Sequence, residues 1–300
     1  MTIDSTTRAI TRGRLLVVAA ALLWSTSGVI VKSPPLQQLM PLSERGPTIA
    51  CYRAAAAALC LLPFVSYRGI RFRWGVVPLI ASFAAMNWLF ITAMTYTTAA
   101  AAIFLQYTST FWASILGVLF LKEPLERRNF VALGFALAGI AWIVAADWNG
   151  ERFWGTLMGL GSGLTYAGVV VSLRALREED GPWLIALCHI VSCGVLLPWI
   201  LAGSVVVDAP QWGLIILLGV VQMAIPYVLF SRGLRDVPAQ EAALIPLFEP
   251  ICNPLWVWLI WNERIPAATL IGGTMILAGL LLRYTGSWLV MRRFSRQSKP

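Results

Sequence analysis

One acidic residue, Glu249, lies at the centre of the long apolar segment 239–261. A segment of that length can cross a bilayer, which takes ~20 apolar residues. A carboxylate at bilayer depth costs about 2.5–3.5 kcal/mol on insertion scales, so Glu249 is expected to face protein or a wet cavity. There its carboxyl group can exchange a proton, or in its ionised form bind the ammonium group of a solute. Glu249 is therefore the first candidate for chemistry, as a proton or cation site, and a structural tie to a neighbouring helix is the alternative.

Three prolines, Pro246, Pro250 and Pro254, surround Glu249 in the same segment. Each proline removes a backbone donor and can kink or unravel a helix. Irregular backbone persists at membrane depth only where it faces protein or lines a water-filled cavity. The segment therefore predicts a pathway through the membrane, with a purely structural kink as the alternative.

The chain as a whole is built from apolar segments. Of its 300 residues, 58% are hydrophobic and only 12% are charged, whereas about 25% are charged in soluble domains. We therefore predict an all-α integral membrane protein in which ten transmembrane helices are joined by short loops. The ten apolar segments are 15–31, 47–66, 74–95, 99–121, 129–146, 153–173, 183–202, 212–230, 239–261 and 268–285.

Lysine and arginine predict the orientation of these helices. With the N-terminus inside, the inner loops and termini hold 18 of the 23 basic residues and the outer loops hold four. Positive residues accumulate on the cytoplasmic side. Both termini are therefore expected in the cytoplasm, in a multi-pass protein of the cytoplasmic (inner) membrane. The same loops explain the net charge of +9, so no nucleic-acid partner is expected.

The second half of the chain repeats the first at a constant shift of 140 residues, which places Gly28 on Gly168 and Phe90 on Phe230. Each half holds five helices, an odd number, so the second copy enters the membrane from the opposite side. We predict two inverted five-helix repeats followed by a basic cytoplasmic tail whose Arg-rich end is too short to fold. Inverted repeats are common in secondary transporters, whose substrate sites lie near the midplane between the repeats. The boundaries are 14–147 and 154–286 for the repeats, 287–300 for the tail and 292–300 for its Arg-rich end.

Polar side chains within the apolar segments are the candidates for lining a central cavity, because lipid cannot satisfy their hydrogen bonds. Gln106 and Thr110 share one helical face of segment 99–121, and Glu249 and Asn253 do the same in segment 239–261. The alternative is hydrogen bonding between helices without a ligand, worth ~0.6 kcal/mol per contact. The aromatic members of a second set either stack on an organic substrate or pack. This second set of pathway candidates is Trp24, Ser27, Asn87, Tyr166, Gln222 and Tyr227.

Arg53 lies inside a predicted span, one to two turns from its outer end. It is expected to snorkel outward or to pair with an acidic group, so a structural anchor and an anion-binding role both stay open. Its counterpart in the second half is Cys193, so the two equivalent helices need not have the same role.

Sequence patterns typical of enzymes and metal sites are absent. There is no HExxH, GxSxG or Walker sequence, which argues against an enzyme and against ATP-driven pumping by this chain. The five cysteines lie in apolar segments without CxxC spacing, and the one histidine, His189, makes no metal site. We therefore expect no catalytic residue, no metal and no cofactor.

Two stretches carry a resemblance to a known family: AMTYTTAAAAIFLQYTSTFWASILGVLFLKEPL (93–125) and GLRDVPAQEAALIPLFEPICNPLWVWLIWNERI (233–265). Each ends in an acidic residue, Glu123 or Glu263, and is followed by a Gly-rich helix. The sequence resembles the EamA family of the drug/metabolite transporter superfamily. The resemblance implies a ten-helix carrier, often an exporter of amino acids, metabolites or toxic compounds. Glu123 and Glu263 are expected to cap or tie the next helix rather than to bind substrate.

The sequence thus predicts a secondary transporter that moves a small organic solute across the cytoplasmic membrane by alternating access, in the direction of export. An uncoupled facilitator or antiporter of the same fold is the alternative, followed by a membrane scaffold without transport activity. The expected partners are a small-molecule substrate and the lipid bilayer. Proton coupling through Glu249 and a homodimer stay open.

Overall fold

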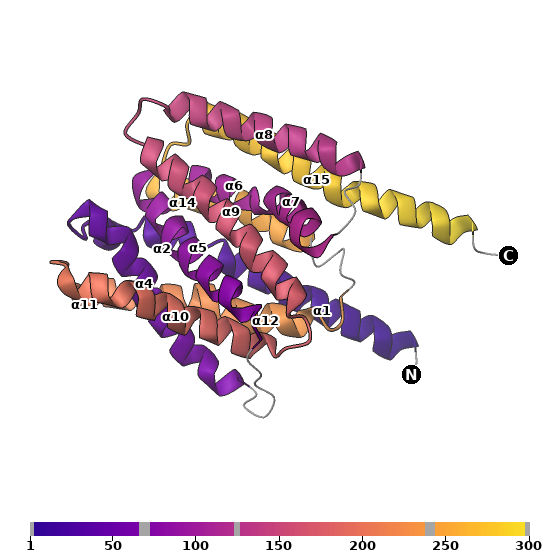
Figure 1. Cartoon of the computed structure of the whole chain (residues 1–300), viewed down its shortest axis with the longest axis horizontal. Helices are drawn as coiled ribbons and strands as arrows, with labels where there is room; N and C mark the ends of the chain where they lie inside the picture. Colours follow the sequence, from indigo (N-terminus) through magenta and orange to yellow (C-terminus); the bar gives the residue numbers. More distant parts are fainter. Residues whose placement is uncertain (1–2, 66–72, 123–126, 238–243, 298–300) are drawn as a thin grey trace.

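The computed structural model describes residues 3–65, 73–122, 127–237 and 244–297, and every regular element within these ranges is a helix. Figure 1 shows a bundle in which the two chain termini lie at the same end. The first half contains α1 (Ile3–Trp24), α2 (Ser27–Val31), α3 (Pro34–Gln37), α4 (Leu42–Leu61), η1 (Leu62–Phe64), α5 (Val76–Tyr96), α6 (Ala99–Tyr107), α7 (Ser109–Leu121) and α8 (Arg127–Asp147). The second half contains α9 (Phe153–Ala175), α10 (Gly181–Ala202), α11 (Ala209–Leu217), η3 (Leu218–Ala224), α12 (Ile225–Gly233), η4 (Ile245–Phe248), α14 (Glu249–Trp261) and α15 (Ala267–Gln297).

The helix boundaries confirm the internal duplication. Helix α7 and helix α14 begin and end 140 residues apart, and α8 and α15 begin 140 residues apart. Helices α7 and α14 also end in the same way, in left-handed residues at equivalent positions, Lys122 with φ 55° and Asn262 with φ 52°. Left-handed residues commonly end helices because they stop the hydrogen-bond ladder. The two halves therefore share one backbone plan.

The contact between α8 and α15 shows that the two halves are inverted. The two helices lie side by side (Figure 1). The Gly272 carbonyl lies 2.5 Å from where a Cβ on Gly139 would be, and the Ala132 carbonyl lies 2.8 Å from the same point on Gly279. The 140-residue shift maps Gly139 onto Gly279 and Gly272 onto Ala132, so each contact is converted into the other, as a two-fold axis requires. The contacts also run antiparallel, so the axis lies across the helices, in the plane of the membrane, as the sequence predicts.

The helices have the length and composition of membrane spans. Among the described residues, eight segments are long and apolar enough to cross a bilayer, and a shorter apolar helix, Ala267–Arg283, follows near the C-terminus. Phe135, Leu137 and Trp142 project from α8 with 40%, 47% and 52% of their surface exposed. Large apolar side chains exposed in this way fit contact with lipid chains, which supports the all-helical membrane fold.

The last helix extends further than the predicted span. Helix α15 continues to Gln297, so the Arg-rich end is not separate from the last helix up to that residue. No proline interrupts the helix there, and a helix propagates more easily than it nucleates. The end of the predicted segment 239–261 that contains Ala239 lies outside the described residues, as does Glu123.

The fourth and ninth segments are each broken near the middle, at equivalent positions. In the first half, α6 ends and α7 begins around Thr108, whose hydroxyl donates to the Leu105 carbonyl at 2.6 Å. In the second half, the tighter η4 precedes α14 at Glu249, where Pro250 has no N–H to continue an α-helix. Side-chain hydroxyls that bond nearby carbonyls compete with the helical ladder. The break in the second half follows from the prolines, whereas the break at Thr108 is not predicted by the sequence.

Candidate functional site

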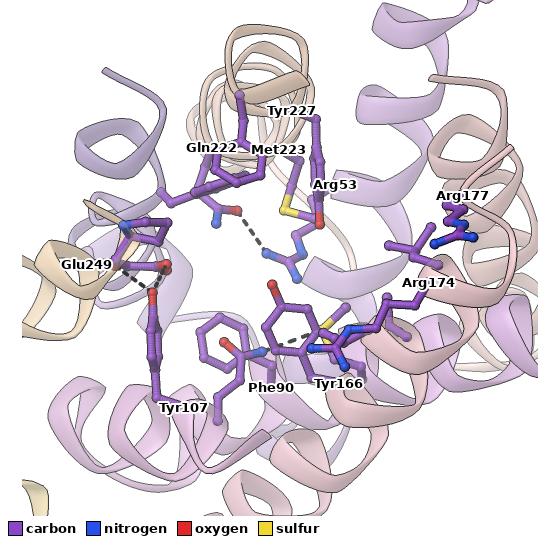
Figure 2. Close-up of a pocket in the computed structure, with 18 residues that line it drawn as sticks. Arg53, Phe90, Tyr107, Tyr166, Arg174, Arg177, Gln222, Met223, Tyr227 and Glu249 are labelled. Carbon is purple, nitrogen blue, oxygen red and sulfur yellow. Dashed lines mark hydrogen bonds between the residues drawn. The ribbon is translucent and has the colours of Figure 1, made fainter. Parts of the chain in front are cut away.

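A cavity of about 480 Å³ lies between the two halves, beside both helix breaks. Figure 2 shows side chains from helices of both repeats converging on it. Of the ten residues predicted to lie on a substrate pathway, six line this cavity: Trp24, Gln106, Tyr166, Gln222, Tyr227 and Glu249. A role for these six in binding substrate stays a prediction, but the structure brings them together at one interfacial site.

Asn253 and Ser27 are not among the cavity-lining residues. The amide of Asn253 donates to the Ser27 hydroxyl at 2.8 Å, and both side chains are fully buried. The alternative considered from the sequence, a hydrogen bond between helices, therefore holds for this pair. The repeat shift maps the pair onto Ala113 and Ala167, which belong to one buried apolar cluster at the equivalent crossing of α7 and α9. The same helix crossing thus uses a polar contact in one copy and an apolar contact in the other.

Thr110 and Asn87 also lie away from the main cavity. Because the helix breaks at Thr108, Thr110 does not share a continuous face with Gln106, and it instead lines a neighbouring cavity of about 300 Å³. Asn87 is fully buried behind the main cavity, where its amide group donates to the Ala50 carbonyl at 3.0 Å and to Ser192 at 2.8 Å. Its side-chain oxygen accepts two hydrogen bonds from Arg53.

Arg53 also lines the cavity. From the sequence, both a structural anchor and an anion-binding role were open for it. Only 1% of its surface is exposed, so it does not snorkel outward, and among the described residues it forms no ion pair. Its Nε and Nη2 donate to Asn87 Oδ1 at 2.9 and 2.6 Å, and its Nη1 donates to Gln222 Oε1 at 3.1 Å. Neutral amide oxygens thus fix a guanidinium group at the cavity wall (Figure 2).

The hydroxyl group of Tyr107 contacts both the Glu249 carboxyl group and a backbone carbonyl at the helix break of the same segment. Tyr107 Oη lies 2.7 Å from the Pro246 carbonyl oxygen and 2.8 Å from Glu249 Oε2 (Figure 2). In a continuous helix that carbonyl would accept from residue 250, but Pro250 has no N–H. A tyrosine hydroxyl has one hydrogen to donate. When Tyr107 donates to Pro246, the contact with Glu249 is a hydrogen bond only if the carboxyl carries a proton.

The cavity opens toward the end of the bundle where both termini lie. Arg174, in the last turn of α9, and Arg177, just after that helix, line the cavity and are exposed at the surface. The neighbouring cavity shares Arg174 and adds Arg283, whose guanidinium contacts the Thr110 carbonyl and Ser114. The mouth is therefore lined by arginines.

The opposite end of the bundle is closed. Lys32, just after α2, pairs with Glu263, just after α14, at 2.8 Å, and also donates to the Thr97 carbonyl at 2.7 Å. The other carboxylate oxygen of Glu263 accepts from the Ala99 backbone N–H at 2.9 Å. Glu263 therefore caps α6 and ties α2 to α14. Its contacts are structural, as expected, but they are made with these helices and not with the next helix, α15.

Sequence reasoning missed Tyr107, Phe90, Arg174 and Arg177 as lining residues. Tyr107 directly precedes the unpredicted helix break, and Arg174 and Arg177 were interpreted only as topology signals. A signal for Arg53 existed, because a charged residue within a span is a functional candidate by default. Among the described residues, no three His, Cys, Asp or Glu side chains group closely enough to hold a metal ion.

Two inverted five-helix repeats around an interfacial cavity that is open at one end define a class, the polytopic membrane transporters. The chain belongs to the EamA-like transporter family, whose model matches residues 11–145 and 153–285. It is 34% identical over 196 residues to an uncharacterized transporter of Archaeoglobus fulgidus, covering 65% of this chain and 70% of that protein. It is 25% identical over 275 residues to the pseudopaline exporter CntI of Pseudomonas aeruginosa, covering 90% and 94%. A crystal structure with 17% identity and a TM-score of 0.62 covers 95% of this chain and 99% of the other, and supports the fold alone.

Proposed function

We propose that this transporter is a secondary carrier that takes a small organic solute from the cytoplasm and exports it by alternating access. The observation that carries the proposal is the asymmetry of the cavity. It is open at Arg174 and Arg177 and closed at the other end by Lys32, Glu263 and the start of α6. A carrier caught with one gate open has this form.

The orientation of the chain supports export. The sequence segments predicted to be inner, which include both termini, hold 18 of the 23 basic residues, and this favours a cytoplasmic location for the end of the bundle with the termini. The open mouth then faces the cytoplasm of a cell whose inner membrane holds the protein. The relative named as a pseudopaline exporter moves its solute in the same direction.

Glu249 is the group we propose to couple a proton to transport. The cavity reaches its carboxyl group, and the Tyr107 hydroxyl connects that group to the Pro246 carbonyl at the helix break. When Glu249 gains or loses a proton, the Tyr107 hydroxyl changes the oxygen to which it donates, either the Pro246 carbonyl or the Glu249 carboxylate. Protonation of Glu249 therefore acts directly on the helix break between η4 and α14, in a segment that has to move during alternating access.

A metabolite-export screen tests the proposal. Cells that overexpress the protein are compared with cells that lack it, and the medium is profiled for solutes whose efflux differs. We expect at least one organic solute to accumulate outside the overexpressing cells, and Glu249→Gln to abolish its efflux or the dependence of efflux on external pH. Glu151→Gln, an exposed position on the closed side, is the matched control.

Two results would contradict the proposal. The absence of any solute whose efflux depends on the protein would remove the carrier function and favour a scaffold. Efflux that Glu249→Gln leaves unchanged at every pH would favour the alternative, an uncoupled facilitator or antiporter with the same cavity.

A further inference from the structure

We infer that the substrate of this cavity is an organic anion, whose carboxylate or phosphate group binds Arg53 and whose apolar body packs between aromatic side chains. The inference rests on the proposed function, because it assigns a chemical class to the solute of the same cavity. It depends on four observations: the unused donors of Arg53, its uncompensated charge, the arginines at the mouth and the aromatic walls.

Two N–H groups of the Arg53 guanidinium are not used in hydrogen bonds to the described residues. A guanidinium carries five N–H groups, and Asn87 and Gln222 accept from three of them. The other two have no partner among the described residues. Because Arg53 is only 1% exposed and lines the cavity, an occupant of the cavity is the group placed to accept them.

The neighbours of Arg53 fix its position without neutralising it. Asn87 directs its oxygen at Arg53 because its own NH2 group is held by the Ala50 carbonyl and Ser192. Gln222 supplies a second amide oxygen, from the π-helical segment η3. A buried charge that lacks an ionic partner is costly. A carboxylate or phosphate bound between the remaining N–H groups supplies that partner, and arginine binds such groups in a bidentate manner.

The arginines at the mouth favour the same sign of substrate charge. Arg174 and Arg177 line the open end, and Arg283 lines the adjoining cavity. Clefts lined by one sign of charge raise the local concentration of oppositely charged ligands. Among the described lining residues, Glu249 is the one acidic group, and the proposed coupling has its carboxyl carry a proton in one state of the cycle. In that state it does not oppose an anion.

The walls between Arg53 and the mouth are aromatic. Tyr166 and Tyr227 both line the cavity (Figure 2), and the rings of Trp24 and Tyr227 meet edge to face with 5.4 Å between centroids. Aromatic side chains around a few fixed polar groups are typical of small-molecule sites. The volume of about 480 Å³ lies in the range of sites that hold drug-sized organic molecules, roughly 300–1,000 Å³.

Binding to the purified full-length protein in phosphatidylcholine nanodiscs tests the inference through the fluorescence of Trp24 and neighbouring tryptophans. The carboxylate probe is 3-phenylpropionate, and 3-phenylpropanamide, 3-phenylpropylamine and L-phenylalanine present the same ring without a net negative charge. Phenyl phosphate separates phosphate from carboxylate recognition. We expect one of the two anions to bind about ten- to a hundredfold more tightly than the amide, as hydrogen bonds to a charged group imply.

Two variants link the effect to Arg53. Arg53→Gln should remove the preference for the anion. Gln222→Glu should do the same with Arg53 retained, because a carboxylate beside the guanidinium occupies its donors. Arg152→Gln, at the closed end beside Asp147, should bind the anion as the unchanged protein does.

Several outcomes would overturn the inference. They are tighter binding of the amine, the amide or the zwitterion, no anion binding at millimolar concentration, or an unchanged preference in Gln222→Glu. Loss of probe binding in phosphatidylglycerol nanodiscs would assign the site to an anionic lipid headgroup instead of a solute. These binding results do not depend on flux, so a failed export assay with intact anion binding would contradict the proposed function alone.

Discussion

The ion pair between Lys32 and Glu263 is expected to act as the latch of the closed gate, and Glu263→Gln should release it. Glu263 joins α14 to α2 through Lys32 and to the first turn of α6 through the Ala99 N–H. These three helices must separate if the cavity is to open on this side. The substitution keeps the size of the side chain and removes its charge.

The magnitude follows from the exposure of the pair. Exposed ion pairs contribute about 0–1 kcal/mol, whereas breaking a buried pair costs about 3–5 kcal/mol. The Lys32 and Glu263 side chains are 13% and 19% exposed and their charged atoms are 2.8 Å apart. An intermediate value of about 1.5–3 kcal/mol, typical of hydrogen bonds to charged groups, shifts the population toward the outward-open state about ten- to 150-fold.

Cysteine accessibility measures this shift. In a background without the five native cysteines, Ala102→Cys places a thiol one turn inside α6, at a fully buried position packed near Val31. A membrane-impermeant maleimide applied to intact cells labels this thiol only when the gate opens. We expect Glu263→Gln to raise the labelling rate about tenfold or more. Glu179→Gln, which breaks an ion pair with Arg73 at the other end, should leave the rate unchanged.

A double variant makes the test stricter. Lys32→Gln should raise the labelling rate as well, and Lys32→Gln combined with Glu263→Gln should add little, because both changes remove the same contact. Unchanged labelling in Glu263→Gln, or an equal increase in Glu179→Gln, would refute the latch and leave the pair as a local helix cap.

Three further predictions address topology, the proton site and packing. Reporter fusions after residues 150 and 298 should report the outside and the cytoplasm, and the opposite pattern would reverse the proposed orientation. Tyr107→Phe should keep expression but alter the pH dependence of efflux, because Glu249 loses its hydroxyl partner; an unchanged pH profile would speak against proton coupling at the helix break. Gly139→Val should lower the melting temperature by the equivalent of about 1–3 kcal/mol, since its Cβ would lie 2.5 Å from the Gly272 carbonyl, whereas Gly134→Val, with no atom within 4 Å of its Cβ, should not.

The fold was predictable from the sequence to a large extent because its determinants are local or periodic. Apolar runs of bilayer length mark the helices, and the 140-residue shift marks the duplication. Six of the ten candidate pathway residues line the cavity, because polar side chains at membrane depth have few alternatives to facing protein or water. Single-sequence periodicity therefore suffices to find the region of the site.

The orientation of individual site side chains depends on partners far away in the sequence. Whether Asn253 faces the cavity is decided by Ser27, 226 residues earlier, and the orientation of Arg53 is decided by Gln222, 169 residues later. The break at Thr108 comes from a side-chain hydroxyl in a segment without proline, so helical spacing wrongly placed Gln106 and Thr110 on one continuous face. Periodicity along one helix cannot supply these long-range contacts.

The differences between the two repeats explain why the cavity is open on one side. The shift of 140 residues maps Lys32 onto Ser172 and Glu263 onto Glu123. The gate at the opposite end therefore has an acidic residue at the position equivalent to Glu263 but serine at the position equivalent to Lys32, so these two positions cannot form the same ion pair. Two inverted repeats with identical side chains would favour neither state, because each state exchanges the conformations of the two halves. A latch present in only one copy lowers the free energy of the state in which that latch is closed. We therefore predict that the chain favours the state with the Lys32–Glu263 end closed and the arginine-lined mouth open.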